Sequence, residues 1–249
     1  MTDIFIFGLC GKMGNMLKDV CAKSGDYRVT GGFDLKKDPE IPTFGDVDAV
    51  NVPFDVIIDF SRPETLPRIR GLAVRTARPV VLATTGYDGE RLAQIRELAK
   101  SVPVFLSGNM SLGISVLLSL VSRAAKALSD KFDVEIIEAH HNQKSDAPSG
   151  TAKMIADSVA ESLDYTPEFV YGRNGANAKR KPAEIGVHSV RGGSVVGEHT
   201  VMFCGPDEVL TISHSAASRS VFALGALKAA DFIKSKPPGL YTMKDLTER

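Results

Sequence analysis

Residues 4–106 alternate short apolar runs with amphipathic segments, and this alternation limits the possible folds more than any other feature of the chain. Strands joined through helices pair in parallel, and the helices then cover both faces of the sheet. We therefore predict an α/β fold with a Rossmann-like, doubly wound parallel sheet. The expected strands are 4–7, 28–33, 56–60, 80–83 and 102–106, and the expected helices are 13–22, 64–74 and 90–100.

From about Ser111 the pattern changes, which indicates a second, α+β domain built on a mixed sheet. β-branched, alternating segments separated by glycine turns favour strands with little helix between them, so we expect more antiparallel pairing there than in the first part. Residues 172–182 are basic and rich in glycine, and we expect a mobile surface loop. The expected helices are 114–129, 152–163 and 220–235, the last ended by Pro237-Pro238-Gly239, and the expected strands are 134–138, 186–190, 195–203 and 208–213.

Charge and cysteine usage narrow the class of protein. Thirty basic and thirty acidic residues give a formal net charge of zero, so nothing favours a nucleic acid or an acidic membrane surface as a partner. The longest apolar run, 112–121, falls short of the ~20 residues that span a bilayer. The start of the chain lacks the pattern of a signal peptide, and three scattered cysteines without a CxxC pair fit a reducing compartment, so we expect a cytoplasmic protein.

Three glycines, Gly8, Gly11 and Gly14, follow the first expected strand and open the first expected helix. Glycines allow a tight turn and a close approach to a pyrophosphate, which the helix start attracts. The spacing is GxxGxxG rather than GxGxxG, so a purely structural turn is the alternative. Asp34 lies about 20 residues beyond, where an acid can bind a ribose hydroxyl, and this favours a dinucleotide site.

The choice between NADH and NADPH stays open. Asp34 would repel the 2′-phosphate of NADP, whereas Lys12, Lys36 and Lys37 could bind it, although a solvated charge pair explains Lys36 and Lys37 equally well. Two more segments, Ala83 to Gly86 and Ser107 to Met110, follow expected strands at the sheet edge where ligands bind. Each could be a plain turn, but their shared edge favours a lining role for nicotinamide and ribose.

Candidate catalytic groups gather between Glu138 and Thr151. A histidine, either His140 or His141, can deliver a proton near neutral pH, and Lys144 can bind an anion or stabilise negative charge. Ser149, Gly150 and Thr151 open a helix whose free N–H groups can bind a carboxylate. Taken singly, Ser149 or Thr151 could be only a helix cap, and Asp146 is best interpreted as a turn residue. One histidine is expected to be structural, because consecutive strand side chains point to opposite faces.

This segment, Glu-Ala-His-His-x-x-Lys-x-Asp-Ala-Pro-Ser-Gly-Thr, resembles the signature of the 4-hydroxy-tetrahydrodipicolinate reductases, also called dihydrodipicolinate reductases. The resemblance covers nearly the whole chain and rests on further blocks that match in order. These are Gly8–Gly14 with Met13, Asp59–Pro63, Thr84–Gly86, Val196–Thr200 and Ser218-Arg219.

The resemblance implies reduction, by NADH or NADPH, of the dehydrated form of 4-hydroxy-tetrahydrodipicolinate to tetrahydrodipicolinate in diaminopimelate and lysine biosynthesis. It implies a homotetramer with a dinucleotide-binding domain over 1–110, joined by the C-terminal helix 219–249, and a substrate-binding and tetramerisation domain over 111–218. By the same resemblance His140 donates the proton, Lys144 assists it, and His141, Gly150 and Thr151 bind a small dicarboxylate. The implied cofactor contacts are Gly8, Leu9, Cys10, Gly11, Lys12, Met13, Asp34, Ala83, Thr84, Thr85, Ser107, Gly108, Asn109 and Met110.

A few positions depart from the family's pattern. Ala83 stands where glycine is common and Lys12 where arginine is common, which bears on cofactor preference and affinity. Asn142 and Gln143 stand where more basic residues are common, which lowers the positive potential around a dicarboxylate. None of these changes removes a residue implied to be catalytic.

Other classes fit the sequence less well. A serine hydrolase would need a GxSxG elbow, and a zinc enzyme would need histidines spaced to bind the metal, whereas His140 and His141 are adjacent and we expect no metal. A non-catalytic dinucleotide-sensing protein is the main alternative. It would keep Gly8–Gly14 and Asp34 but would have no need of His140 with Lys144.

Overall fold

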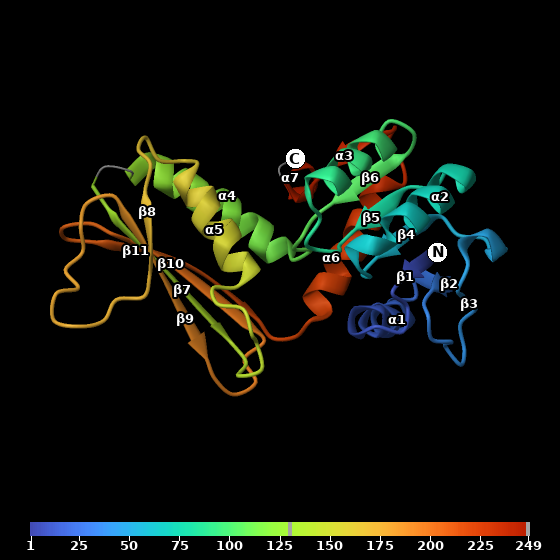
Figure 1. Ribbon diagram of the computed structural model, residues 1–249, viewed down its shortest axis with the longest axis horizontal. Helices are drawn as coiled ribbons and strands as arrows, with labels where there is room; N and C mark the ends of the chain where they lie inside the picture. Colours follow the sequence, from blue (N-terminus) through green and yellow to red (C-terminus); the bar gives the residue numbers. More distant parts are fainter. Residues whose placement is uncertain (129–130, 248–249) are drawn as a thin grey trace. The chain divides into compact units, whose positions relative to one another are not determined.

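The computed structural model describes residues 1–128 and 131–247 and divides the chain into two compact units (Figure 1). The first unit comprises Met1–Leu112 and Arg219–Arg249, and the second comprises Gly113–Ser218. Ser129, the expected last residue of a helix, lies outside the described residues, as does the end of the expected segment 219–249.

The first unit contains a seven-stranded sheet in which all neighbours pair in parallel, in the order β12-β6-β5-β4-β1-β2-β3. The predicted doubly wound sheet is therefore confirmed. Its strands are β1 (Thr2–Phe7), β2 (Tyr27–Phe33), β3 (Thr43–Phe44), β4 (Val56–Asp59), β5 (Val80–Leu82), β6 (Pro103–Leu106) and β12 (Gly239–Tyr241).

Helices lie on both faces of this sheet because its central strands are apolar on both sides. In β1, Ile4 and Ile6 join one core cluster, while Phe5 and Phe7 join the other, as the alternation of strand side chains requires. The first cluster is covered by α1 (Lys12–Ser24) and α6 (Ser220–Ile233), and the second by α2 (Leu66–Thr76) and α3 (Gly89–Leu98). The unit also contains α7 (Met243–Thr247) and the short 3₁₀ turns η1 (Val47–Ala49) and η2 (Pro63–Thr65).

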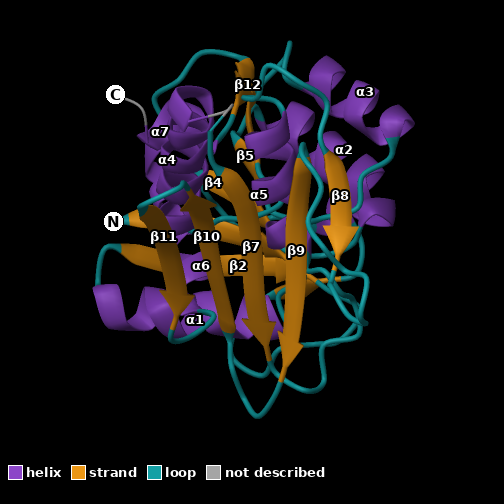
Figure 2. Cartoon of the chain, turned by 90° about the vertical axis from the view of Figure 1, so that its left-hand side faces the viewer, coloured by secondary structure: helices purple, strands orange, loops and turns teal. Residues whose placement is uncertain are grey.

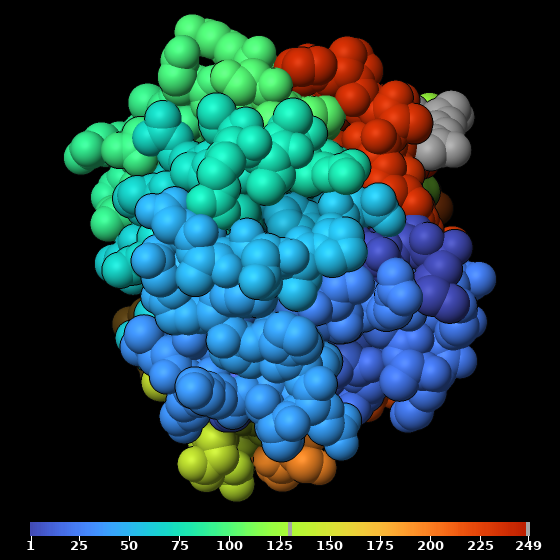
Figure 3. Space-filling model, turned by 90° about the vertical axis from the view of Figure 1, so that its right-hand side faces the viewer, coloured from blue at the N-terminus to red at the C-terminus, as the bar shows by residue number. Residues whose placement is uncertain are grey.

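Strands β3 and β12 have no counterpart in the prediction. The helix α6 ends at Ile233, two residues earlier than expected, and the chain then returns to the sheet, where Leu240 of β12 pairs with Val104 of β6. Unlike the equally short β5, these segments form no continuous apolar run, so the sequence pattern did not reveal them. In the space-filling view of Figure 3, the C-terminal segment in red lies beside N-terminal residues in dark blue, and Lys234 donates a hydrogen bond to Thr2.

The second unit contains a five-stranded mixed sheet in the order β11-β10-β7-β9-β8, with its strands side by side in Figure 2. Helices α4 (Leu112–Leu128) and α5 (Gly150–Ala160) cover one face through a buried apolar cluster, and we call this the inner face of the sheet. The strands are β7 (Asp133–His140), β8 (Glu168–Tyr171), β9 (Glu184–Arg191), β10 (Gly197–Cys204) and β11 (Val209–Ala216).

The predicted mixed sheet is confirmed, and it has more antiparallel pairing than the first sheet, because β10 pairs antiparallel with β7 and β11 while β7, β9 and β8 pair in parallel. Strand β8 was not predicted, and β7 continues to His140 rather than ending at Glu138. In the loop 172–182, expected to be mobile, two arginines make ion pairs with the sheet, Arg173 with Glu184 at 2.6 Å and Arg180 with Glu135.

No helix within the described part of the chain is long and apolar enough to cross a membrane.

Candidate active site

The glycine loop after β1 has the backbone geometry that its sequence requires. Gly8 has a φ of +81°, and a Cβ built on Gly14 would lie 2.2 Å from the Gly8 carbonyl oxygen, so both positions need glycine. Gly11 precedes helix α1 without a side-chain cap, and the first turn of that helix contains no acid. The loop therefore presents N–H groups and a favourable helix dipole to an anion, which fits the diphosphate of a dinucleotide.

Asp34 follows β2 and faces this loop. Its Oδ2 accepts a hydrogen bond from the Cys10 amide at 2.9 Å, and its Oδ1 accepts one from the Lys36 amide at 3.1 Å. The structure thus brings together Asp34 and the glycine loop, which the sequence places 24 positions apart. Lys12, Lys36 and Lys37 are exposed around them.

The other expected cofactor contacts differ in how they could act. The side chains of Leu9 and Met110 are buried in the core, at 0% and 1% exposure, so only their backbone could meet a ligand. Thr84 is buried and Thr85 exposed after β5, while Ser107 folds its own turn by donating to the Asn109 carbonyl at 2.6 Å. Both segments follow the carboxyl ends of parallel strands, where ligands bind such sheets.

Asp59, at the end of β4, was not predicted to have a role in the site. Its carboxylate is fully buried and accepts hydrogen bonds from the Ser61 amide at 2.9 Å and from the Tyr87 hydroxyl at 3.1 Å. Burial raises the pKa of Asp59, and the hydrogen bonds from Ser61, Thr84 and Tyr87 oppose the shift. The residue ties together the segments that follow β4 and β5 at the ligand-binding edge.

In the second unit, strand β7 aims two polar side chains at the inner face. Val134, Ile136, Glu138 and His140 alternate along the strand and are all buried. His140 is 9% exposed, and His141 begins the loop beyond the strand, half-buried, with its carbonyl accepting from the Lys144 amide at 3.1 Å. Because His141 lies beyond the strand, strand alternation does not separate the two side chains, and the expectation that one histidine is structural stays a prediction.

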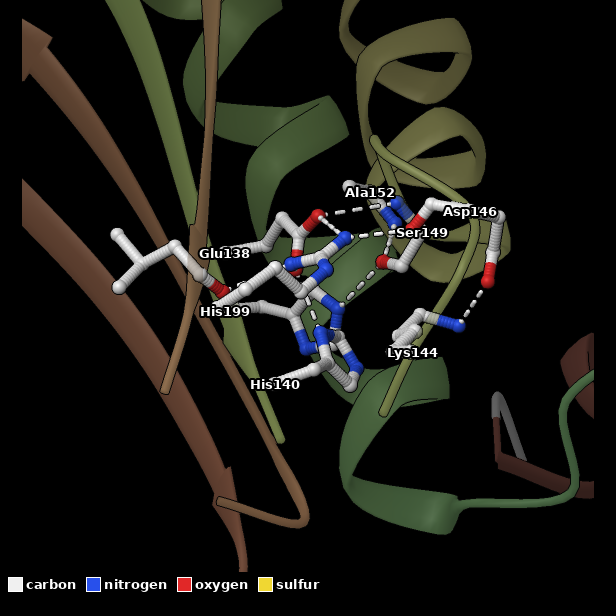
Figure 4. Close-up of polar contacts among 9 residues, drawn as sticks. Glu138, His140, Lys144, Asp146, Ser149, Ala152 and His199 are labelled. Atoms are coloured by element: carbon white, nitrogen blue, oxygen red, sulfur yellow. Dashed lines mark hydrogen bonds and ion pairs between the residues drawn. The ribbon is translucent and has the colours of Figure 1, made fainter. Parts of the chain in front are cut away.

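Glu138 is the centre of a buried polar network (Figure 4). Its Oε2 lies 2.5 Å from Nδ1 of His140, and its Oε1 accepts the Ser149 amide at 3.1 Å. Arg191, at the end of β9, donates to Oε2 at 2.8 Å and to Oε1 at 2.7 Å. Burial alone would raise the pKa of Glu138, but the hydrogen bonds from Arg191, Ser189, His140 and Ser149 together lower it to about 2. Glu138 is therefore ionised at neutral pH.

Ser149 caps helix α5 and contacts a third histidine. Its Oγ accepts a hydrogen bond from the Ala152 amide at 3.1 Å and lies 3.2 Å from Nε2 of His199 on β10. Burial, followed by the nearby charge of His140, lowers the pKa of His199 to about 4, so this imidazole is neutral at pH 7. The predicted capping role of Ser149 is confirmed, and Gly150 and Thr151 form the first turn of α5 behind it.

Lys144 and Asp146 lie on the loop between β7 and α5, on the helix side of the strands (Figure 4). The Nζ of Lys144 is 2.7 Å from Oδ1 of Asp146, and the hydrogen bond from Lys144 lowers the pKa of Asp146. Asp146, expected only as a turn residue, is therefore the ion-pair partner of Lys144. In the described part of the chain, no group of three or more His, Cys, Asp or Glu side chains could hold a metal ion.

The sequence prediction missed Arg191, His199 and the role of Glu138. Glu138 could have been found, because the alternation with Val134 and Ile136 places it on the buried face. Arg191 comes from a strand that pairs with β7 across about fifty positions of sequence, and His199 from one that pairs across about sixty, and only the strand register brings them to the site.

The two units thus contain two kinds of chemistry. The first unit offers an anion-binding glycine loop with an acid for a ribose. The second offers an imidazole held by a carboxylate, a lysine and a helix N-terminus, which together can donate a proton and bind carboxylates.

Comparisons with known proteins agree with this arrangement. A family model described as "Dihydrodipicolinate reductase, N-terminus" matches residues 2–110, and one described as "Dihydrodipicolinate reductase, C-terminus" matches residues 113–247. The 4-hydroxy-tetrahydrodipicolinate reductase of Caldanaerobacter subterraneus subsp. tengcongensis is 50% identical, covering 100% of this chain and 99% of its own. The enzyme of the same name from Clostridium botulinum is 45% identical, with coverages of 99% and 98%.

A solved structure agrees as well. The dipicolinate-bound dihydrodipicolinate reductase from Paenisporosarcina sp. TG-14 superposes with a TM-score of 0.81 at 25% identity, covering 98% of each chain.

Proposed function

The chain belongs to the dihydrodipicolinate reductase family, and on that premise we propose how its residues divide the reaction. It is an NAD(P)H-dependent oxidoreductase that reduces the dehydrated form of 4-hydroxy-tetrahydrodipicolinate to tetrahydrodipicolinate in diaminopimelate and lysine biosynthesis. The reaction adds a hydride to one carbon of a conjugated C=C–C=N system and a proton to the adjacent position.

We propose that His140 donates the proton. The observation that supports this role is the hydrogen-bonding distance of 2.5 Å between its Nδ1 and the ionised carboxylate of Glu138. That contact leaves Nε2 as the nitrogen that can donate. Nε2 lies beside Gly197, whose missing side chain leaves space next to the ring.

We propose that Lys144, His141, Gly150 and Thr151 bind the two carboxylates of the substrate. A compact ammonium and the N-terminus of an eleven-residue helix both attract anions. Lys144 also stabilises the negative charge that develops as the hydride arrives, and so assists His140. The small dicarboxylate bound to the relative from Paenisporosarcina supports this proposal.

We propose that Gly8 to Met13, Asp34, Ala83 to Thr85 and Ser107 to Met110 hold the cofactor, which supplies the hydride when bound. Asp34 is oriented by the Cys10 amide and can accept from the ribose hydroxyls, which favours NADH. The exposed lysines Lys12, Lys36 and Lys37 give a 2′-phosphate cationic partners, so we propose that NADPH is accepted too.

We further propose a cytoplasmic homotetramer, built through the outer face of the five-stranded sheet, which is the face that α4 and α5 leave uncovered. Exposed apolar side chains on this face, namely Ile137, Val190 and Val209, support the assembly, and three free cysteines support a reducing compartment. Light scattering of the purified chain measures the oligomeric state, and a monomeric mass would contradict the assembly.

The assay for the proposed roles follows nicotinamide absorbance after hydroxy-tetrahydrodipicolinate, generated enzymatically, is added with NADH or NADPH. We expect substrate-dependent oxidation in the unmodified protein and a loss of ~10²–10⁴-fold in kcat for His140→Gln, the range of acid–base catalysis. Near-normal turnover of that variant would reject His140 as the donor. Cofactor binding without any substrate-dependent oxidation would favour the dinucleotide-sensing alternative.

A further inference from the structure

We propose that Glu138, clamped by Arg191, is a positioning residue that sets two parts of the site at once. It orients the imidazole of His140, and it fixes the start of helix α5 on which the substrate-binding residues lie. This inference rests on the proposed role of His140 as proton donor.

The first half of the proposal follows from the contact between Glu138 and His140. An Nδ1–H that donates to a carboxylate fixes both the tautomer and the plane of the ring. Because Glu138 is completely buried, water screens this interaction little. The contact with Nδ1 thereby leaves Nε2 as the nitrogen that can donate.

The second half follows from the other oxygen of the same carboxylate. Oε1 accepts the amide of Ser149, which is the cap residue of α5, directly before Gly150 and Thr151. A single side chain thus connects the proton donor at the end of β7 to the helix N-terminus that is proposed to bind a substrate carboxylate. Any movement of Glu138 shifts both.

Arg191 holds Glu138 in this position. It approaches both carboxylate oxygens in a paired, fork-like geometry and also donates to the Asp146 carbonyl at 2.6 Å, so it ties the loop of Lys144 to the same network. A guanidinium that binds both oxygens of a carboxylate fixes the orientation of that carboxylate and also balances its charge.

The same strand provides a matched control. Glu135 lies on the outer face of β7 and also contacts a histidine and arginines, with Nε2 of His188 at 2.7 Å and Arg173 at 3.3 Å. This second cluster has the same chemistry but is separated from His140 by the sheet. Glu135→Gln therefore measures the general effect of neutralising a paired glutamate on β7.

The experiment compares Glu138→Gln with Glu135→Gln. We expect Glu138→Gln to lower kcat by about 10²-fold, because the imidazole of His140 loses the carboxylate that fixes its tautomer and plane. Glu135→Gln should retain kcat within about twofold. In ¹⁵N NMR, Glu138→Gln should mix the two tautomers of His140, whereas a merely structural role of Glu138 would leave the tautomer as in Glu135→Gln and would overturn the positioning of His140.

Binding of dipicolinate tests the link to α5. We expect Glu138→Gln to weaken dipicolinate about tenfold, the equivalent of about 1.4 kcal/mol, because the helix start loses its anchor. Unchanged affinity would overturn that half of the proposal.

A measurement on the unmodified protein keeps the proposal testable if Glu138→Gln fails to fold. In ¹⁵N NMR of labelled histidines, we expect the neutral form of His140 to carry its proton on Nδ1. A proton on Nε2 would overturn the inference. If the proposed function itself is wrong, His140→Gln will retain turnover. Lost turnover in His140→Gln with a normal kcat in Glu138→Gln would reject the positioning role alone.

Discussion

Asp34 and Cys10 are joined by a hydrogen bond of 2.9 Å from the Cys10 amide to the Asp34 carboxylate, although α1 and β2 separate them in the chain. The acid proposed to bind the ribose therefore also holds the glycine loop in place. Replacing it with alanine would disturb both functions, whereas asparagine keeps an oxygen acceptor and removes only the charge.

We predict that Asp34→Asn shifts the ratio of kcat/KM between NADPH and NADH by about tenfold toward NADPH, because the charge that repels a 2′-phosphate is gone. Steady-state kinetics with both cofactors measures the ratio. Asp26→Asn, which removes an exposed acid just before β2, is the control and should leave the ratio unchanged. An unchanged ratio in Asp34→Asn would contradict the ribose role.

A second prediction concerns the ion pair of Lys144 with Asp146. The Asp146 side chain is half exposed and competes with the substrate carboxylates for the ammonium group. Exposed pairs are worth up to about 1 kcal/mol, so Asp146→Asn should lower the KM for the substrate by about two- to fivefold, with kcat nearly constant. A raised KM would show that Asp146 instead holds Lys144 in its working position.

Space beside His140 gives a third prediction. A Cβ on Gly197 would lie 3.1 Å from Nε2 of His140, closer than an ordinary contact, so Gly197→Ala should push the ring and crowd the nitrogen proposed to donate. We expect kcat to fall about tenfold with little loss of stability. Gly192→Ala is the control, since a Cβ there would meet nothing within 4 Å. Equal activity of both variants would mean that Nε2 needs no such space.

Acid stability gives a fourth prediction. The pKa of His199 falls from 6.5 to about 4 on folding, and that of Glu138 from 4.5 to about 2, so the unfolded chain binds more protons than the folded chain as the pH falls through these ranges. Each group therefore contributes stability that is complete above its unfolded pKa and is lost as the pH falls toward its folded pKa. The free energy of unfolding should decrease by up to ~1.4 kcal/mol per pH unit for each group.

Urea denaturation at several pH values measures this dependence. His199→Gln should flatten the curve between the ordinary pKa of histidine, 6.5, and the lowered value of about 4, and should leave the steeper acid limb of Glu138. The same slope in the variant and in the unmodified chain would show that His199 does not titrate in this range.

The sequence predicted the sheet of the first unit well because each central strand is apolar on both faces and each helix has an apolar face at helical spacing. It also predicted the cap at Ser149, and it placed the candidates His140 and Lys144 in the same short segment, where they stay a prediction. The prediction ended strand β7 too early, because Ala139 and His140 become strand only through their pairing with Val190 and Arg191 of β9.

What the sequence could not predict depends on distant pairing. Arg191 reaches Glu138 because β9 lies beside β7, and His199 reaches Ser149 because β10 lies on the other side. Neither strand order nor register follows from local periodicity. The ion pairs of the arginines in the loop 172–182 do not follow from local periodicity either. The composition of that loop indicated only a mobile segment.

Helix α6 has a consequence for how the chain is made. Its residues Ala223, Ala226 and Ile233 belong to the same core cluster as Ile4 and Ile6, yet the ribosome produces them only after the entire second unit. Until then, one face of the nascent first sheet is covered only in part, by α1, and the rest is available to chaperones or to aggregation. Premature termination anywhere within the second unit would leave that face partly uncovered, so the integrity of the first unit depends on translation continuing through the second.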